Sequence, residues 1–107
     1  MPGFLANHDA IKAKGVDAIC CISVNDPFVM GAWAKDTGTG DKVMMLGDGN
    51  CEFTEAMGLT LDASRNGLGK RSQRYAMVVE DGTIKALYVE KPGAFEVSTA
   101  ESVLKGL

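Results

Sequence analysis

The feature that most constrains the fold is a short apolar run that leads directly into a helix start. Residues 16–24 are mostly apolar and rich in β-branched side chains, a pattern typical of a strand covered on both faces in a parallel sheet. Asn25, Asp26 and Pro27 follow at once, and Asp before Pro predicts a capped helix with proline in its first position. A buried strand followed by a capped helix indicates an α/β protein.

The rest of the chain continues this alternation and then ends in a hairpin and a helix. The expected helices and strands are helices at 4–14, 27–35 and 51–57 and strands at 42–46, 74–79 and 83–90. Asp81-Gly82 between two apolar runs predicts a tight hairpin turn, whereas residues 60–73 look irregular. Ser98 and Glu101 have the spacing of a capping box that would open a last helix. We therefore expect a mixed sheet flanked by helices and, because no repeat or linker is present, one domain over residues 1–107.

Charge and hydropathy exclude several classes of partner. The net charge is −3 and the basic residues are scattered, so no nucleic-acid partner is expected. No apolar run approaches the roughly 18 residues of a membrane span, and no secretory leader is visible. We expect a cytoplasmic location, or an organellar one if a transit peptide was lost with a missing N-terminus.

The chain has three cysteines, Cys20, Cys21 and Cys51, and one histidine. There is no Cys-x-x-Cys pattern or Cys/His cluster, so we expect neither a zinc site nor any other cofactor. Cys20 and Cys21 are adjacent on a predicted strand, where side chains point to opposite faces, and they cannot easily bridge each other. The simplest interpretation is three reduced, mostly buried thiols.

Cys51 is a candidate reactive thiol with arguments on both sides. Asn50 could cap the 51–57 helix and place Cys51 at its first position, where the helix dipole would lower the thiol pKa. The nearby carboxylates of Asp48, Glu52 and Glu55 would raise it.

Two other groups of residues have both a functional and a simpler interpretation. His8 lacks a cysteine or serine partner nearby in the sequence, so a solvent-facing or capping role is favoured over catalysis. Lys70, Arg71 and Arg74 form a small basic cluster after two glycines. A phosphate-binding loop is an alternative there, but the required Gly-Lys-Ser/Thr sequence is absent.

A series of segments in register resembles the type-5 (type II, atypical) peroxiredoxins, which are thiol peroxidases with a thioredoxin-like fold. The matching segments are Pro2-Gly3-Phe4, Ser23-Val24-Asn25-Asp26, Gly67-Leu68-Gly69 before Arg71-Ser72, Arg74-Tyr75, Glu80-Asp81-Gly82 and Pro92-Gly93-Ala94-Phe95. The similarity runs along essentially the whole chain. It implies an incomplete thioredoxin-like fold that lacks the N-terminal strands.

In that family a Pro-x-x-x-Thr-x-x-Cys segment carries the peroxidatic cysteine and precedes a Met-Pro-Gly-Phe sequence. Here Met-Pro-Gly-Phe stands at positions 1–4, so the chain looks like an N-terminally truncated peroxiredoxin domain. The central strand of the fold would then be absent, which would leave two apolar strands with unpaired edges. We expect the polypeptide alone to be marginally stable, swapped, aggregated or dependent on a partner fragment.

The resemblance implies reduction of hydrogen peroxide and alkyl hydroperoxides, with glutaredoxin, glutathione or thioredoxin as the thiol reductant. Without the peroxidatic cysteine, these 107 residues are expected to be inactive. The alternative is a non-catalytic truncated paralogue that binds full-length peroxiredoxins through the dimer face of the family.

The resemblance also implies roles for individual residues. Arg74 matches the arginine that contacts the peroxidatic cysteine and polarises peroxide; the alternative is a surface arginine at a strand end. Cys21 matches the second, resolving cysteine of plant-type members, whereas Val97 occupies the resolving position of animal members. Cys20 is most simply a small apolar strand residue.

The homodimer implied by the family would use apolar side chains of the second and third helices. Met30 and Trp33 are the candidates for that contact. Phe28, Trp33 and Phe53 also fit a core pattern, which is the default for an aromatic residue on an amphipathic helix.

Overall fold

The computed structural model describes all 107 residues, which gather into two compact units. Asp17–Ser72 form one unit, and Met1–Val16 together with Gln73–Leu107 form the other. None of the helices is both long enough and apolar enough to span a bilayer. The single domain over residues 1–107 stays a prediction.

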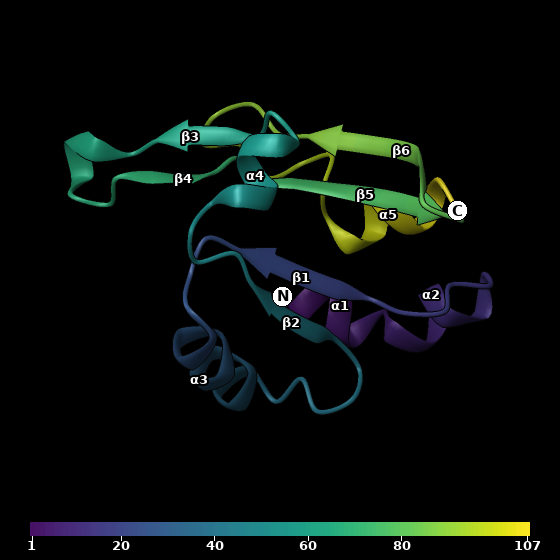
Figure 1. Ribbon diagram of the computed structural model, residues 1–107. Helices are drawn as coiled ribbons and strands as arrows, with labels where there is room; N and C mark the ends of the chain where they lie inside the picture. The colour runs from purple at the N-terminus through teal and green to yellow at the C-terminus, as the bar shows by residue number, and fades with distance from the viewer. The chain divides into compact units, whose positions relative to one another are not determined.

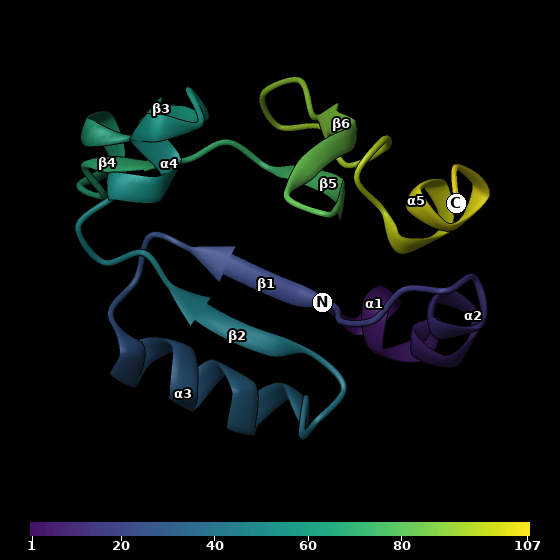
Figure 2. The ribbon, with the colours of Figure 1, turned by 45° about the vertical axis from the view of Figure 1, so that its right-hand side comes forward.

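The Asp17–Ser72 unit begins with a strand, a helix and a second strand. β1 (Cys20–Ser23) and β2 (Met44–Gly47) pair in parallel, and α3 (Pro27–Thr37) connects them. α3 lies along β2 in both views (Figures 1 and 2), and Met30 on its inner side is only 1% exposed. The predicted parallel pair is confirmed, although the paired strands are shorter than the apolar runs. The expectation that the first strand is covered on both faces is wrong, because Cys20 is exposed and no residue of β1 is buried.

Local sequence signals explain where α3 begins and ends. Asp26 precedes the helix, and its carboxylate accepts a hydrogen bond from the Val29 amide at 2.8 Å. Pro27 occupies the first position, where a missing N–H costs nothing. Gly38 ends the helix with φ of +70°, a conformation that glycine adopts without strain. The predicted cap is confirmed.

The second half of this unit contains a short hairpin that the sequence did not predict. α4 (Glu52–Ala56) leads into β3 (Thr60–Asp62), which pairs antiparallel with β4 (Lys70–Ser72). The short helix η1 (Ser64–Asn66) lies between these strands. The expectation of an irregular segment over 60–73 is therefore wrong. Strands of three residues are too short to show the alternation that identifies a strand.

The other unit begins with two short helices instead of one. α1 (Pro2–Ala6) and α2 (His8–Ala13) replace the single helix expected over 4–14. Asn7 separates them, and its side-chain amide donates to the Gly3 carbonyl oxygen at 2.8 Å. Asn competes with the helix for backbone partners, which explains the break.

The predicted hairpin is present in this unit. β5 (Tyr75–Glu80) pairs antiparallel with β6 (Thr83–Val89), with one irregularity in the register. Asp81 and Gly82 both have positive φ, +51° and +75°, as a two-residue hairpin turn requires. The Asp-Gly signal is thus confirmed by the backbone it predicts.

The last helix, α5 (Ala100–Lys105), has a different cap from the expected one. Thr99 precedes it, and the Thr99 hydroxyl oxygen accepts from the Ser102 amide at 3.1 Å. The capping box that begins at Ser98 is therefore wrong by one residue. Ser98 is instead engaged by Glu90, which lies eight residues earlier.

The strands form one parallel pair and two antiparallel pairs, as three two-stranded sheets. This mixture, together with the helices, confirms the α/β class. The strands that were expected in one mixed sheet pair separately, and β1 and β5 each have a single hydrogen-bonded neighbour. Every strand of a two-stranded sheet has one unpaired edge, so the absence of a central strand between β1 and β5 stays a prediction. That the chain is marginally stable or associates for this reason stays a prediction.

Candidate functional site

Arg74 stands immediately before β5 and is exposed. Its guanidinium carbon lies 4.7 Å from the centroid of the Phe95 ring, which is within the range of a cation–π contact. Within its own unit the guanidinium has no carboxylate partner. The result is a cation that is held in place but not neutralised, which could attract an oxygen that carries or develops negative charge.

Glu90 follows β6 and ties the chain after it back to the hairpin. Its amide donates to the Arg74 carbonyl oxygen at 3.0 Å. One oxygen of its carboxylate accepts from the amides of Glu96 and Ser98, both at 2.8 Å, and from the Ser98 hydroxyl at 2.7 Å. Burial alone would raise the pKa of this carboxyl, but these hydrogen bonds outweigh burial and lower the pKa to about 2.

The two adjacent cysteines have different surroundings. Cys20 is exposed and Cys21 is half-buried, because neighbours on β1 point to opposite faces. The expectation of three mostly buried thiols is therefore wrong, since only Cys51 is buried. Burial raises the pKa of the Cys21 thiol. Because a thiol reacts as its thiolate, this environment makes Cys21 less reactive at neutral pH than an ordinary cysteine.

Cys51 is buried, with 5% exposure, and its backbone has φ of +62°. It does not occupy the first helical position with Asn50 as its cap. Cys51 itself precedes α4, and the Asn50 side chain donates to the Glu52 carboxylate at 3.3 Å. The expected Asn50 cap is therefore wrong.

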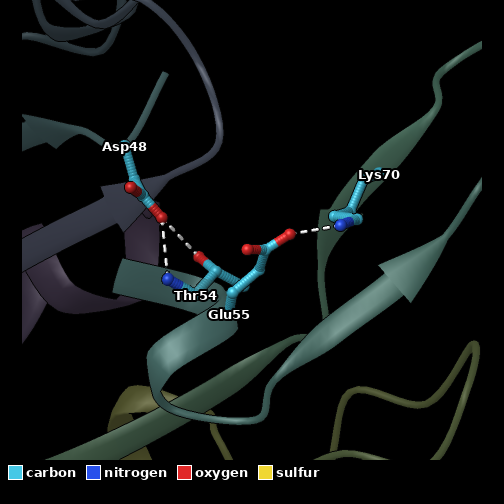
Figure 3. Close-up of polar contacts among 4 residues, drawn as sticks. All are labelled: Asp48, Thr54, Glu55 and Lys70. Atoms are coloured by element: carbon cyan, nitrogen blue, oxygen red, sulfur yellow. Dashed lines mark hydrogen bonds and ion pairs between the residues drawn. The ribbon is translucent and has the colours of Figure 1, made fainter. Parts of the chain in front are cut away.

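Asp48 caps α4 instead (Figure 3). Its carboxylate accepts from the amides of Phe53 and Thr54 at 3.1 and 2.9 Å and from the Thr54 hydroxyl at 2.7 Å. Burial would raise the pKa of Asp48, but these hydrogen bonds lower it below its ordinary value. The amides at this helix start are therefore occupied by the Asp48 carboxylate and not by the side chain of Asn50 or Cys51.

Lys70 and Arg71 line a cavity of about 470 Å³ in the Asp17–Ser72 unit, together with the start of α3. Lys70 is paired with Glu55 (Figure 3). Arg71 donates to the carbonyl oxygens of Leu68, at 2.8 Å, and Val24. Both cations thus have partners on the protein and tie β4 to its neighbours, so a phosphate-binding role gains no support from the geometry.

The remaining candidates have simpler roles. The Nδ1–H of His8 donates to the carboxylate of its neighbour Asp9 at 2.9 Å. Met30 is buried, so its expected place in a dimer contact is wrong. Trp33 is half-buried. Phe28 is 86% exposed, so the prediction that it lies in the core is wrong. Phe53 is also partly exposed.

Sequence reasoning missed three residues: Asp48 as a cap, and Glu90 and Phe95 as neighbours of Arg74. The contacts of Asp48 and Glu90 join residues six and eight positions apart, beyond the spacing of capping motifs. A carboxylate between a strand and a Pro-Gly turn was the available signal for Glu90. No group of three or more His, Cys, Asp or Glu side chains is placed to hold a metal ion.

The model of the Redoxin family matches residues 1–104. Among curated proteins, chloroplastic Peroxiredoxin-2E of Arabidopsis thaliana is 51% identical, and the alignment covers 100% of this chain and 47% of that protein. The chain therefore spans about half the length of the curated relatives that it matches first.

Solved structures agree with the fold. Reduced Prx3 from Vibrio vulnificus, determined in complex with H₂O₂, is 48% identical and superposes with a TM-score of 0.94 over 99% of this chain and 68% of that one. A crystal structure from Burkholderia cenocepacia, provisionally named a thioredoxin reductase, is 54% identical and has a TM-score of 0.98 over 99% of this chain and 63% of that one. The thioredoxin-like peroxiredoxin fold is thereby confirmed.

Proposed function

Because this chain belongs to the Redoxin family, we propose that it is the part of a thiol peroxidase that polarises the peroxide, and that the attacking thiol is not among its three cysteines. The substrate is hydrogen peroxide or an alkyl hydroperoxide, and the reductant is a thiol. The observation that carries the proposal is Arg74, a cation fixed by a ring and not neutralised by a carboxylate in its own unit.

The chemistry needs such a cation. In thiol peroxidation a thiolate sulfur attacks one peroxide oxygen, the O–O bond breaks, and the sulfur is oxidised to a sulfenic acid. The other oxygen leaves with the electron pair as hydroxide or alkoxide and then takes a proton. Guanidinium N–H groups aimed at that oxygen stabilise its developing charge, which is the role proposed for Arg74.

The surroundings of the three cysteines do not single out one of them as the attacking thiol. Cys20 is an exposed strand residue, and burial raises the pKa of Cys21. Cys51 is buried beside a helix start that the Asp48 carboxylate already occupies. We therefore expect the 107-residue chain alone to reduce peroxide no faster than free cysteine does.

The first test is peroxide consumption by the purified chain with a thiol reductant, together with its intact mass after treatment with peroxide. Slow, unselective oxidation of all three cysteines is expected. Fast turnover with a single cysteine oxidised would refute the proposal, and that cysteine would be the attacking thiol.

The second test concerns Arg74. The chain replaces the region that it matches in the Vibrio vulnificus protein, and the rate constant of this chimera with peroxide is measured. Arg74→Lys should reduce it by about 10²-fold, as loss of an oriented donor does. The control Arg65→Lys changes an exposed arginine of η1 and should have almost no effect. Equal rates for the two variants would contradict the role of Arg74.

The reductase name of the Burkholderia protein is not carried over to this chain. The chain has no Cys-x-x-Cys pair, and Gly67-x-Gly69 is not followed by the third glycine of a dinucleotide-binding motif. The location that we propose is cytoplasmic or organellar. Relatives named for the chloroplast and the mitochondrion support the organellar option.

A second function, binding to full-length peroxiredoxins, is favoured by one observation. Phe28, in the first turn of α3, is 86% exposed, and Val29 beside it is also exposed. An exposed phenylalanine next to another apolar side chain suits a protein contact. Co-expression with a full-length homologue should give mixed dimers that Phe28→Glu abolishes, while Lys35→Glu on the same helix leaves them intact. Separate elution of the two wild-type chains at micromolar concentration would count against this function.

A further inference from the structure

The contact between Arg74 and Phe95 has an unusual property for an arginine partner. An aromatic face attracts a guanidinium without accepting its hydrogen bonds, whereas a carboxylate would occupy the N–H donors and cancel the charge. Over Phe95, at 4.7 Å, Arg74 therefore keeps both its charge and its donors. A ring is the better support if the guanidinium has to meet an incoming oxygen.

Phe95 is not held by a hydrophobic core, because it is 55% exposed. Its position depends on the backbone of the segment from Lys91 to Ser98. This segment turns at Gly93, which has φ of +78°, and the Ala94 amide donates to the Lys91 carbonyl oxygen at 2.9 Å. A turn alone leaves the far end of the segment free, so a second restraint is needed.

Glu90 provides that restraint. Glu90 is 6% exposed, and its carboxylate accepts hydrogen bonds from the amides of Glu96 and Ser98, on the far side of Phe95. Its own amide bonds to the carbonyl oxygen of Arg74. One residue thus joins the backbone of the arginine to both ends of the segment that carries the ring.

We infer that Phe95 is a positioning residue for Arg74, and that the Glu90 carboxylate sets this position by closing the Lys91–Ser98 segment. The inference deepens the proposed function, because it matters for catalysis only if Arg74 meets peroxide. The geometric part stands on contacts within the Met1–Val16 and Gln73–Leu107 unit alone.

The test is an NMR measurement on the full 107-residue chain. Protons above an aromatic ring are shielded, so the Arg74 Nε–H and side-chain methylene signals should lie upfield of those of the other arginines. Phe95→Leu should remove this displacement, and Phe95→Tyr should retain it, because the aromatic face is kept. An Arg74 signal that does not differ between wild type and Phe95→Leu would overturn the inference.

The Glu90 part has a matched control in the same segment. Glu90→Gln removes the charge of the buried carboxylate. It should move the chemical shift of the Arg74 signal toward the value measured in Phe95→Leu. Glu96→Gln makes the same change in an exposed side chain and keeps the backbone amide that donates to Glu90. It should leave the Arg74 signal unchanged. Equal effects of the two variants, or no effect of either, would overturn the role of Glu90.

Two further measurements distinguish an effect on folding from an effect on function. Far-UV circular dichroism confirms that each variant keeps its secondary structure; should Glu90→Gln unfold, Ser98→Ala removes one of its hydrogen bonds and is read in the same way. The rate effect of Arg74→Lys, described above, tests the proposed function independently. If that effect is absent while the Phe95 shift is present, Arg74 is positioned but not catalytic.

Discussion

Met30→Ala tests whether α3 is anchored as the structure places it. Met30 is 1% exposed and one of the largest fully buried side chains, and its sulfur lies 3.8 Å from the Asn25 side-chain nitrogen. The substitution removes three buried heavy atoms, at about 0.8 kcal/mol each, or about 2.4 kcal/mol of transfer free energy. The unfilled cavity raises the expected loss in the free energy of unfolding to about 3 kcal/mol.

The assay is urea unfolding followed by the fluorescence of Trp33, the single tryptophan of the chain, which lies on the same helix. The control is Met44→Ala on β2, which makes the same chemical change at 56% exposure and should cost less than about 0.5 kcal/mol. If the wild type is only marginally stable, Met30→Ala should be unfolded without urea while Met44→Ala is folded. Equal losses for the two variants would refute the burial argument.

Three further predictions concern the carboxylates and the glycines. The pKa of Glu90 is about 2 in the folded chain against an ordinary 4.5. Its contribution to stability is therefore complete above about pH 4.5 and is lost as the pH falls toward 2. In acid titrations Glu90→Gln should weaken this loss of stability, and a loss equal to that of the wild type would contradict the prediction. Asp48→Asn should speed hydrogen exchange of the first α4 amides, and protection equal to wild type would exclude Asp48 as their cap. Gly47→Ala should destabilise by about 1–3 kcal/mol, because its Cβ would lie 2.8 Å from a backbone carbonyl oxygen. Gly31→Ala, in open space on α3, should stabilise the chain by about 0.5–1 kcal/mol. Thermal melts of the two glycine variants measure both changes, and a reversed order of stability would contradict both predictions.

The arginine and the cysteines of this chain have different surroundings. Arg74 keeps its charge over an aromatic ring, whereas burial raises the pKa of the Cys21 thiol and Cys51 is buried beside a helix start that Asp48 caps. Activation of a peroxide and attack on it are separable tasks, since one needs hydrogen-bond donors and the other a thiolate. The proposed experiments test the two tasks separately.

The sequence by itself determined the features that depend on neighbouring residues. The cap and proline that open α3 and the Asp-Gly turn between β5 and β6 lie where the sequence predicted them. The physical reason is that these signals act within about four residues through backbone conformation and single hydrogen bonds. The resemblance in register was likewise sufficient to predict the family and the fold.

Only the tertiary structure decided which side chains meet across longer stretches. Asp48 replaced Asn50 as the cap of α4, and Thr99 replaced Ser98 as the cap of α5, because Ser98 is bound by Glu90. Arg71 reaches a carbonyl oxygen 47 residues away, and no local pattern encodes such a partner. Buried carboxylates take whichever donors the folded backbone brings to them, so their partners follow from the packing of the chain and not from its spacing.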